Sequence, residues 1–293
     1  MTNRFRAFTI AGAVVVGVLW LALPLSAAGQ ARKAQAGCPT KDPAVFHKCA
    51  TERMKTFSPP RTPDGKPDMQ GIWSRTHFAQ DIEEHPDVIE VDAEKSMIVD
   101  PPDGKIPYLP WAAAQRKENF AKYISPPTFC FPSGIRYIHF GDTQILQDPG
   151  AVVFMQERVH DYRVIPTDGR PHVGRDMKLW KGDSIGRWEG NTLVVDVTNF
   201  NGLTWFDHAA NFATDAIHIT ERFTMVDANT IHYEATIEDP AVYTRPWKMS
   251  MALKREREKG FEFMEEACHE GIRDLPQFYR QGFRRYPGVV PPK

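Results

Sequence analysis

The chain has 293 residues, of which 36 are basic and 37 acidic, so its formal net charge is −1. No basic stripe with interleaved aromatic side chains runs through it, and the usual signature of nucleic-acid binding is therefore absent. The length suits one large domain, or one domain with a long N-terminal arm, and the sequence predicts no oligomeric state.

The first residues indicate an export signal. Arg4 and Arg6 form a short positive start, residues 8–25 are almost wholly apolar, and residues 26–28 are Ser-Ala-Ala, which suits signal peptidase. We therefore predict a signal peptide over residues 1–28 and a periplasmic or secreted protein. An uncleaved membrane anchor is the alternative, because the apolar run is long. No second segment of membrane length follows, so no membrane association is predicted after cleavage.

The cysteines predict disulfide bonds. An even number of cysteines in an exported chain is typical of disulfides. Cys38 and Cys49 are the natural local pair, which leaves Cys130 and Cys268 as the second pair. The alternative for this second pair is two free thiols. Because no Cys-x-x-Cys occurs, the cysteines do not predict a metal site.

The first part of the chain, residues 37–135, is rich in proline and turn signals. The stretches 58–73 and 99–111 contain Pro-Asp-Gly and Pro-Pro steps, which resist regular structure. We predict an extended N-terminal arm that wraps the domain behind it. One short helix is predicted in the arm, roughly over residues 111–122.

Residues 136–293 have the pattern of an antiparallel β domain, in which apolar runs of strand length are separated by turn residues. Strands are predicted within the segments 151–165, 177–200, 217–226, 230–239, 245–256 and 261–269. Short turns favour antiparallel neighbours, and seven or eight strands would have exposed edges unless the sheet closed. We predict a barrel or a sandwich. A barrel of about eight strands is just wide enough to fill with side chains or to hold one small ligand.

Four titratable side chains share the inward face of this predicted barrel. Strand alternation puts Glu221 in the middle of an apolar row and Asp239 at the inward end of the next strand. The last predicted strand ends inward with Glu265 and His269. Carboxylates in a shared low-dielectric site push at least one pKa upward. A carboxylic acid, a carboxylate and an imidazole in one pocket are the parts of general acid–base chemistry, so these four residues form the predicted catalytic site.

Structural roles compete with catalytic ones at each of these positions. The inward carboxylates could be paired with Arg163 or Arg245 as buried ion pairs. Asp239 precedes a proline, which is a common start of a turn. His269 could only hydrogen-bond a neighbouring strand.

The sequence predicts no metal and no cofactor. His218 and Glu221 have the spacing of metal ligands, but positions three apart on a strand face opposite ways. An ion held by Glu221, Glu265 and His269 is the alternative, although zinc sites are usually richer in nitrogen or sulfur. No Gly-x-Ser-x-Gly, phosphate loop or dinucleotide fingerprint occurs, which argues against α/β-hydrolase, nucleotide and nicotinamide chemistry.

Further residues are predicted to bind a substrate or ligand at the barrel mouth. The loop 202–212 supplies three of them, because loops at barrel mouths often carry function; its alternative role is to fold over the open end. Arg245 could bind an anionic group, or balance Asp239 instead. The predicted binding residues are Arg245, Trp247, Tyr162, Trp205, Asp207 and His208.

Several motifs spread over nearly the whole mature chain carry a resemblance. They are PDGKPDMQGIW, VDPPDGKIP, HDYRVIPTDGRPH, GDSIGRWEGNTLVVDVTNF, ERFTMVDANTIHYEATIEDP, YTRPW and ACHEG. Together they resemble an abundant family of secreted proteins from soil bacteria. The resemblance implies export and a shared fold and, because the family has no established activity, no mechanism. The predicted barrel is also similar to lipocalin-like (calycin) domains, an analogy that carries no function by itself.

The sequence therefore predicts a mainly β protein with a calycin- or lipocalin-like antiparallel barrel, a proline-rich N-terminal arm and a short helix. We predict a secreted enzyme that applies acid–base chemistry to a small apolar or aromatic molecule, as a lyase, isomerase or hydrolase. In it, Glu221 is the base or the partner in a shared proton, Glu265 the second carboxylate and His269 the acid, while Arg245 orients the substrate. The alternatives are a non-catalytic barrel of the cell envelope that binds a small ligand, and an interaction protein whose interior is filled.

Overall fold

The computed structural model describes residues 37–76, 81–83, 95–132, 134, 141–268 and 272–292. The predicted signal peptide over residues 1–28 and the predicted acid His269 lie outside the described residues. Within these ranges, no helix is long and apolar enough to cross a membrane.

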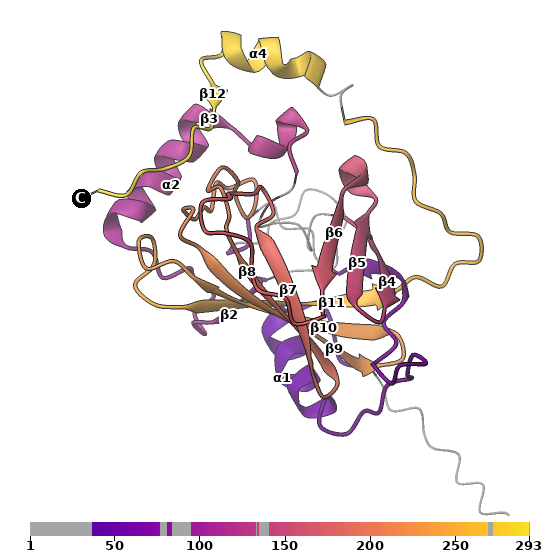
Figure 1. Cartoon of the computed structure of the whole chain (residues 1–293). Helices are drawn as coiled ribbons and strands as arrows, with labels where there is room; N and C mark the ends of the chain where they lie inside the picture. Colours follow the sequence, from indigo (N-terminus) through magenta and orange to yellow (C-terminus); the bar gives the residue numbers. More distant parts are fainter. Residues whose placement is uncertain are drawn as a thin grey trace, which may run out of the picture. The chain divides into compact units, whose positions relative to one another are not determined.

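The described chain is mainly β, with short helices before, between and after the strands (Figure 1). The strands are β1 (Gly71–Arg75), β2 (Ile98–Asp100), β3 (Tyr123–Ile124), β4 (Thr143–Asp148), β5 (Ala151–Gln156), β6 (Tyr162–Pro166), β7 (Asp183–Glu189), β8 (Thr192–Thr198), β9 (His218–Asp227), β10 (Thr230–Glu238), β11 (Trp247–Arg255) and β12 (Arg284–Arg285). The described helices are α1 (Pro43–Arg53), α2 (Pro110–Lys122) and α4 (Leu275–Arg280), with 3-10 turns η1 (Pro126–Phe129), η3 (Arg158–His160) and η4 (Ile272–Asp274).

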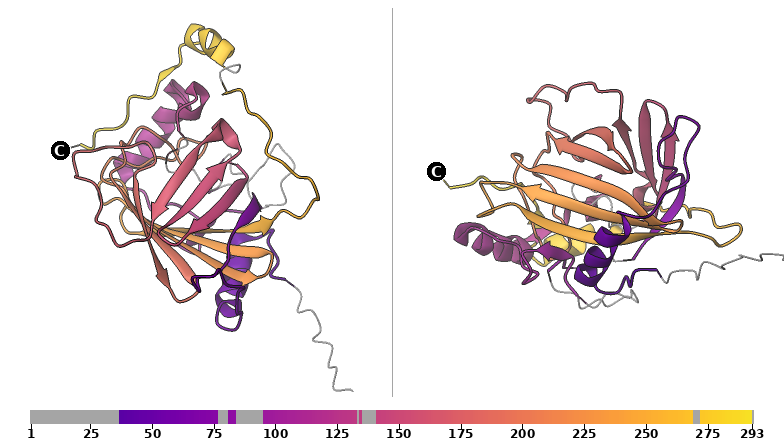
Figure 2. Two further views of the ribbon diagram at one scale, coloured as in Figure 1. Left: turned by 45° about the vertical axis from the view of Figure 1, so that its right-hand side comes forward. Right: turned by 90° about the horizontal axis from the view of Figure 1, so that it is seen from below.

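Ten of the described strands form one antiparallel sheet that curls into a nearly closed barrel (Figure 2). Its order is β6-β5-β4-β1-β11-β10-β9-β8-β7, and β2 pairs with β11 beside this path. The two end strands meet through side chains, since Nε of Arg163 on β6 donates to Oγ of Ser184 on β7 at 2.8 Å. A Cβ at Gly186 would lie 2.7 Å from Cγ2 of Ile165, so only glycine lets β7 come this close to β6. The predicted calycin-like antiparallel barrel is confirmed.

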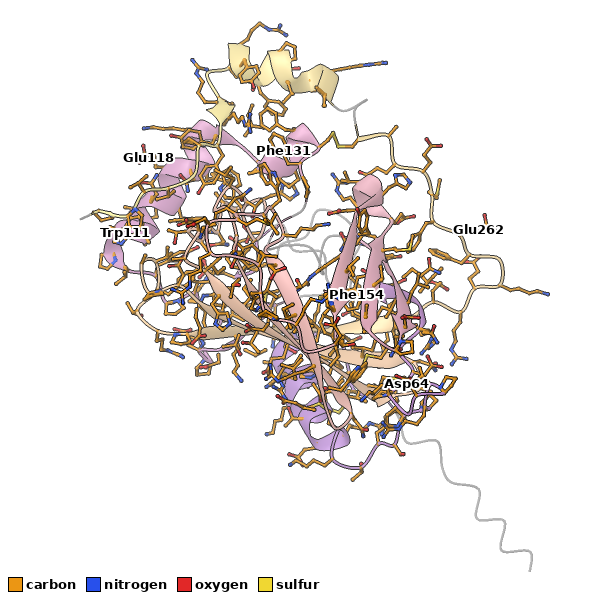
Figure 3. The ribbon with its side chains drawn as sticks, in the orientation of Figure 1. Asp64, Trp111, Glu118, Phe131, Phe154 and Glu262 are labelled. Atoms are coloured by element: carbon orange, nitrogen blue, oxygen red, sulfur yellow. A yellow bond between two sulfur atoms is a disulfide. The ribbon has the colours of Figure 1, made fainter. Side chains whose placement is uncertain are left out.

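Apolar side chains fill the barrel interior. On β9, alternation turns Ile219, Phe223 and Met225 inward, where each is no more than 5% exposed. Phe154 of β5, labelled in Figure 3, meets Phe223 edge to face with ring centroids 5.0 Å apart. Trp73 is also completely buried. Full burial of one such side chain stabilises the fold by about 1.5–3 kcal/mol, so the barrel is held together by its packed interior.

Part of the predicted N-terminal arm belongs to the barrel. β1 lies between β4 and β11 in the sheet, and its Trp73 points into the core. β2 also pairs with β11. The segment 71–75 contains no proline and carries one large inward aromatic side chain, so it can pair on both edges. The barrel therefore begins well before residue 136, while the helix predicted over residues 111–122 is confirmed as α2.

α1 covers the outer face of the barrel beside β9, β10 and β11 (Figure 2). The carboxylate of Asp42 caps its first turn by accepting from the backbone N–H groups of residues 44 and 45, as N-cap residues do. Phe46 and Ala50 pack against Val226 and Ala252 on the outer face of the sheet. The sheet is thus covered on its outside at this point, and α1 has a fixed position on it.

Both predicted disulfides are confirmed. Cys38 is bonded to Cys49, which staples the chain before α1 to the helix itself. Cys130 is bonded to Cys268, 138 residues further along the chain. Two disulfides fit a protein that folds in an oxidising compartment.

The strand predicted over residues 261–269 is wrong. Residues 261–267 have no regular secondary structure, and Figure 3 shows Glu262 on a segment that runs apart from the barrel strands. The reason is tertiary: β11 pairs with β10 along one edge and with β1 and β2 along the other. No edge of β11 is left for residues 261–267 to join.

Candidate functional site

The interior carboxylate Glu221 is held in a buried ion pair. Its Oε2 accepts from Nη2 of Arg163 at 2.5 Å, and its Oε1 accepts from the hydroxyl of Tyr233 at 3.1 Å. Glu221 is 5% exposed and Arg163 is 6% exposed. The cavity beside the pair has a volume of about 10 Å³, which is room for one water at most. Glu221 does point inward as predicted, but among the described residues the space beside it is too small for a substrate.

The predicted acid–base partners do not share that site. Glu265 lies on the irregular segment 261–267 and is exposed. The neighbouring Glu266 forms an ion pair with Arg158, with 2.8 Å between the charged atoms. An exposed carboxylate and a buried one do not share a water-poor cavity, so the predicted pairing of Glu221 with Glu265 is wrong.

Asp239 has the structural role that its position before a proline indicates. The carboxylate is 1% exposed and accepts from the backbone N–H and the hydroxyl of Thr214 at 2.7 and 2.8 Å. It also accepts from the backbone N–H of Ala241 at 3.1 Å. These bonds fix the turn after β10 against the loop before β9, and they occupy the carboxylate.

The predicted binding residues are scattered. Arg245 is exposed and pairs with Asp100 at 2.9 Å, so its charge is balanced by Asp100 and not by Asp239. Trp247 is completely buried in the core. Tyr162 is 63% exposed and lies beneath the ammonium of Lys181, 5.3 Å from its ring centroid. These residues line no common site.

The loop 202–212 closes one end of the barrel, as its structural alternative expects. Trp205 is 1% exposed and meets the ring of Tyr286 at 5.2 Å. Asp207 is completely buried and accepts from the backbone of Ile82 at 2.9 Å and from the side chain of Asn211 at 2.5 Å. Burial, with the nearby charge of Asp81, raises the pKa of Asp207 to about 7 despite these hydrogen bonds. His208 is half-buried beside Cys268 in a hollow of about 290 Å³.

A larger hollow lies at the opposite end of the barrel, where the β4–β5 and β7–β8 turns meet a loop of the N-terminal arm. Its volume is about 500 Å³, within the range of small-molecule sites. Gln147, Val152 and Trp188 occupy inward-facing positions of β4, β5 and β7, so this hollow is the open end of the barrel interior. We call it the mouth pocket; its lining residues are Thr62, Pro63, Asp64, Lys66, Gln70, Gln147, Asp148, Pro149, Val152 and Trp188.

The arm loop is fixed across the mouth pocket. The amide of Gln147 accepts from the backbone N–H of Met69 at 2.6 Å and donates to the carbonyl of Pro67 at 3.0 Å. At the other side, a guanidinium nitrogen of Arg61 donates to Oδ1 of Asn191, in the β7–β8 turn, at 2.6 Å. The loop therefore bridges two hairpin turns and forms a preformed wall.

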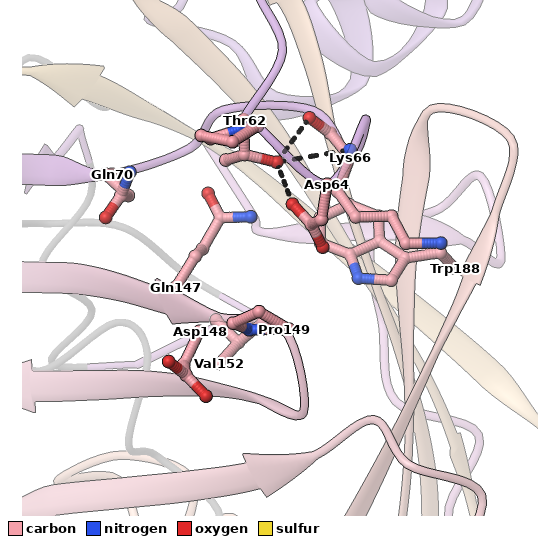
Figure 4. Close-up of a pocket in the computed structure, with 10 residues that line it drawn as sticks. Thr62, Asp64, Lys66, Gln70, Gln147, Asp148, Pro149, Val152 and Trp188 are labelled. Carbon is pink, nitrogen blue, oxygen red and sulfur yellow. Dashed lines mark hydrogen bonds between the residues drawn. The ribbon is translucent and has the colours of Figure 1, made fainter.

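Charged groups in the mouth pocket are left available for a ligand. Figure 4 shows Trp188 beside Asp64, with Asp148 across the hollow. Asp64 accepts a hydrogen bond from the hydroxyl of Thr62. Among the described residues, neither the Lys66 ammonium nor the Asp148 carboxylate has a hydrogen-bond or ion-pair partner. The pocket thus offers an indole, one uncommitted cation and one uncommitted anion.

Sequence reasoning missed this pocket because its walls are far apart in the chain. From the sequence alone, the stretch 58–73 is predicted only as part of a proline-rich arm. The available signal was the inward position of Gln147 and Trp188 at strand ends, which strand alternation predicts once the register is known.

Two polar clusters lie on the outer face of the barrel. In one, the rings of His172 and His218 alternate with carboxylates: His172 contacts Asp183 and Asp196, and His218 contacts Asp196 and Glu238, all within 3.0 Å. In the other, between α1 and β10, His47, His232 and Glu234 place their potential ligand atoms within 4.8 Å of one another. This second cluster is the one group among the described residues whose geometry could hold a metal ion.

Comparisons with known proteins give no family. No protein-family model matches the chain, and no curated protein matches it. Among solved structures, the chain is similar to one described as "REP1-NXSQ fatty acid transporter", at 9% sequence identity and a TM-score of 0.26. The match covers 40% of this chain and 71% of that one. At that TM-score the likeness carries no argument about this protein.

Proposed function

We infer that the protein binds a small molecule in the mouth pocket. The observation that carries the inference is a hollow of about 500 Å³ at the open end of the barrel, lined by Trp188 and by the uncommitted Lys66 and Asp148. Barrels of this size commonly hold one small ligand, and among the described residues the mouth has the space for one. The acid–base enzyme is the weaker hypothesis, since Glu221 is paired with Arg163 beside a cavity of only about 10 Å³.

The chemistry of the lining indicates the class of ligand. The indole of Trp188 offers a flat apolar surface, and aromatic rings of this kind pack against flat apolar faces. Lys66 favours an anionic or hydroxyl group, and Asp148 favours a hydrogen-bond donor. We infer a ligand with one flat apolar face and several polar groups, such as a sugar acid or a hydroxylated aromatic acid. The amide of Gln147 is engaged with the arm loop, so it shapes the wall.

The same proposal places the protein outside the cytoplasm. The two disulfides support folding in an oxidising compartment, and the sequence supports a signal peptide over residues 1–28. Membership of the family of secreted soil-bacterial proteins that the motifs resemble belongs to this proposal as well. A ligand-binding barrel of the periplasm or the cell surface is consistent with both.

Binding calorimetry with the full chain tests the proposal, using a panel of hexoses, sugar acids and hydroxybenzoates. We expect an anionic member to bind, and Trp188→Ala and Lys66→Met each to weaken it by about tenfold, equivalent to about 1.4 kcal/mol. Lys117→Met is the matched control, because Lys117 is an exposed lysine on α2, away from the mouth pocket. Equal affinities for Lys66→Met, Lys117→Met and the unchanged protein would refute the assignment of the site.

A further inference from the structure

The contact between α1 and β10 places two imidazoles and a carboxylate around one point. Nδ1 of His47 lies 3.0 Å from Nε2 of His232 and 3.7 Å from Oε2 of Glu234. Zinc ligands at about 2.0–2.1 Å in a tetrahedron are about 3.3 Å from one another. These two separations lie on either side of that value, and the potential ligand atoms of all three residues lie within 4.8 Å of one another, so the side chains must draw together for one zinc ion to contact all three.

The ligand atoms are the kinds that zinc takes in open sites. Two imidazole nitrogens and one carboxylate oxygen form a set that recurs in zinc sites with three protein ligands and one open position. A pocket of about 290 Å³ lies beside this cluster, and its lining includes His232 and Glu234. Arg222 and Lys55 also line this pocket, so the open position can take water or a small anion.

The surrounding structure holds the ligands in place. The ammonium of Lys248 contacts Oε1 of Glu234 at 3.1 Å, which leaves Oε2 facing His47. The hydroxyl of Ser250 lies 3.0 Å from Nε2 of His232 and donates to the backbone carbonyl of Tyr233. The Lys248 contact orients the carboxylate as outer contacts of metal ligands do, whereas Ser250, which uses its proton on Tyr233, accepts from Nε2 of His232, and zinc must displace that contact to bind this nitrogen. Lys248 also places one positive charge near the ion, which the carboxylate of Glu234 offsets.

The position of His47 is fixed by the packing of α1. The neighbouring Phe46 is completely buried against the sheet, and the disulfide between Cys38 and Cys49 staples the helix. His232 is 2% exposed on the outer face of β10, where a small apolar side chain would pack under the helix at no polar cost. A buried imidazole is costly unless its nitrogens have partners; Nε2 of His232 has His47 and Ser250 at 3.0 Å each, and a shared ion replaces the direct contact between the two histidines.

We propose that His47, His232 and Glu234 form a zinc site between α1 and the outer face of the barrel. The ion is held by Nδ1 of His47, Nε2 of His232 and Oε2 of Glu234, with the fourth position open to the pocket. A single proton shared by the two imidazoles is the competing arrangement, and it requires no metal. The site is separate from the mouth pocket and does not depend on the function proposed for it.

The test is metal binding by the full, disulfide-bonded chain after treatment with a chelator. We expect one Zn²⁺ per chain by calorimetry, and with Co²⁺ the intense visible absorption of a tetrahedral site. His47→Ala and Glu234→Gln should each weaken Zn²⁺ binding by about 100-fold, with an unchanged far-ultraviolet circular dichroism spectrum. His172→Ala, in the other histidine cluster, is the matched control and should change the affinity by less than about twofold.

A measurement on the unchanged chain covers the case in which a variant fails to fold. Zn²⁺ should shift the ¹⁵N resonances of Nδ1 of His47 and Nε2 of His232, and of no other described histidine. The proposal is overturned by weak or substoichiometric Zn²⁺ binding, by undiminished affinity in a folded His47→Ala variant, or by shifts at His172 and His218 instead.

Discussion

The buried pair of Arg163 and Glu221 gives the sharpest prediction about stability. Both side chains are less than 7% exposed, so solvent screening is small. Removing one member of such a pair costs about 3–5 kcal/mol, because the other charge stays buried without its partner. We expect a loss of this size for Glu221→Leu, which removes the charge and keeps a side chain of similar size, and for Arg163→Met. The double variant Arg163→Met/Glu221→Leu should lose much less, about 1–3 kcal/mol, since it leaves mainly the hydroxyl of Tyr233 without its acceptor.

Urea unfolding, followed by circular dichroism, measures these free energies of unfolding. The two single losses sum to about 6–10 kcal/mol, so a double-mutant cycle should show a coupling of several kcal/mol. Equal m-values for all variants would show that each exposes a similar surface on unfolding, so that their free energies of unfolding can be compared. If the single variants lose less than about 1 kcal/mol, or if the losses add, the charges do not stabilise each other and a structural role for Glu221 is refuted.

Three further predictions concern the disulfides and the pH dependence of stability. Cys130→Ser/Cys268→Ser should lower the free energy of unfolding by about 5 kcal/mol and Cys38→Ser/Cys49→Ser by about 3 kcal/mol, from loop-closure entropy; urea unfolding checks the order, and a larger loss for the short loop contradicts it. Burial raises the pKa of Asp207 to about 7, so as pH rises the unfolded chain loses the Asp207 proton before the folded chain does. The free energy of unfolding should therefore fall by up to about 4 kcal/mol as pH rises from about 4 to about 7. Asp207→Asn should remove this pH dependence, and an unchanged dependence refutes the prediction. Burial lowers the pKa of His172 and His218, but hydrogen bonds to their carboxylate partners outweigh burial and raise the pKa of both. The stabilisation from these histidines is therefore complete below about pH 6.5 and is lost as pH rises through the raised pKa values. His172→Asn/His218→Asn should flatten the pH dependence of stability in that window, and an unflattened profile contradicts the assignment.

Local patterns carried much of the fold prediction. The hairpin of β9 and β10 was predictable because alternation and a short turn lie within one stretch of about twenty residues. The inward direction of Glu221 followed from the same alternation. The disulfides were predictable because there are four cysteines and two of them lie close together in the sequence. Each of these inferences needs no knowledge of which distant segments meet.

The failures have one physical cause, which is that edge pairing is decided by distant segments. Residues 261–267 have strand-like alternation, but β1 already occupies the edge of β11 that they would have joined. The face predicted for Glu265 therefore does not exist. Conversely, β1 was interpreted as part of an irregular arm, because its proline-rich flanks hide a short strand that pairs on both sides.

The candidate sites were hidden for the same reason. His47 and His232 are 185 residues apart in the chain, and their contact depends on where α1 packs. A partial signal was present on β10, where His232 and Glu234 are two positions apart and so lie on one face of the strand. The site predicted from the sequence lies on the inward rows of the strands, whereas this pair lies on the outward row that α1 covers.

The polar groups of this barrel differ in whether they can still bind something. The candidate sites have side chains that can form further bonds next to open space, and the structural polar groups do not. Both carboxylate oxygens of Glu221 are engaged by Arg163 and Tyr233 beside about 10 Å³ of space, so a substrate would have to break the pair and displace packed side chains to reach it. Among the described residues, the ammonium of Lys66 has no partner and lies beside about 500 Å³ of space, so a ligand that binds it there displaces none of these residues. A charged group that points into a packed barrel is costly to bury, so the fold must give it a partner. Its inward position is thus evidence of a structural role. A charged group at the mouth that the fold leaves unsatisfied is the one available to a ligand.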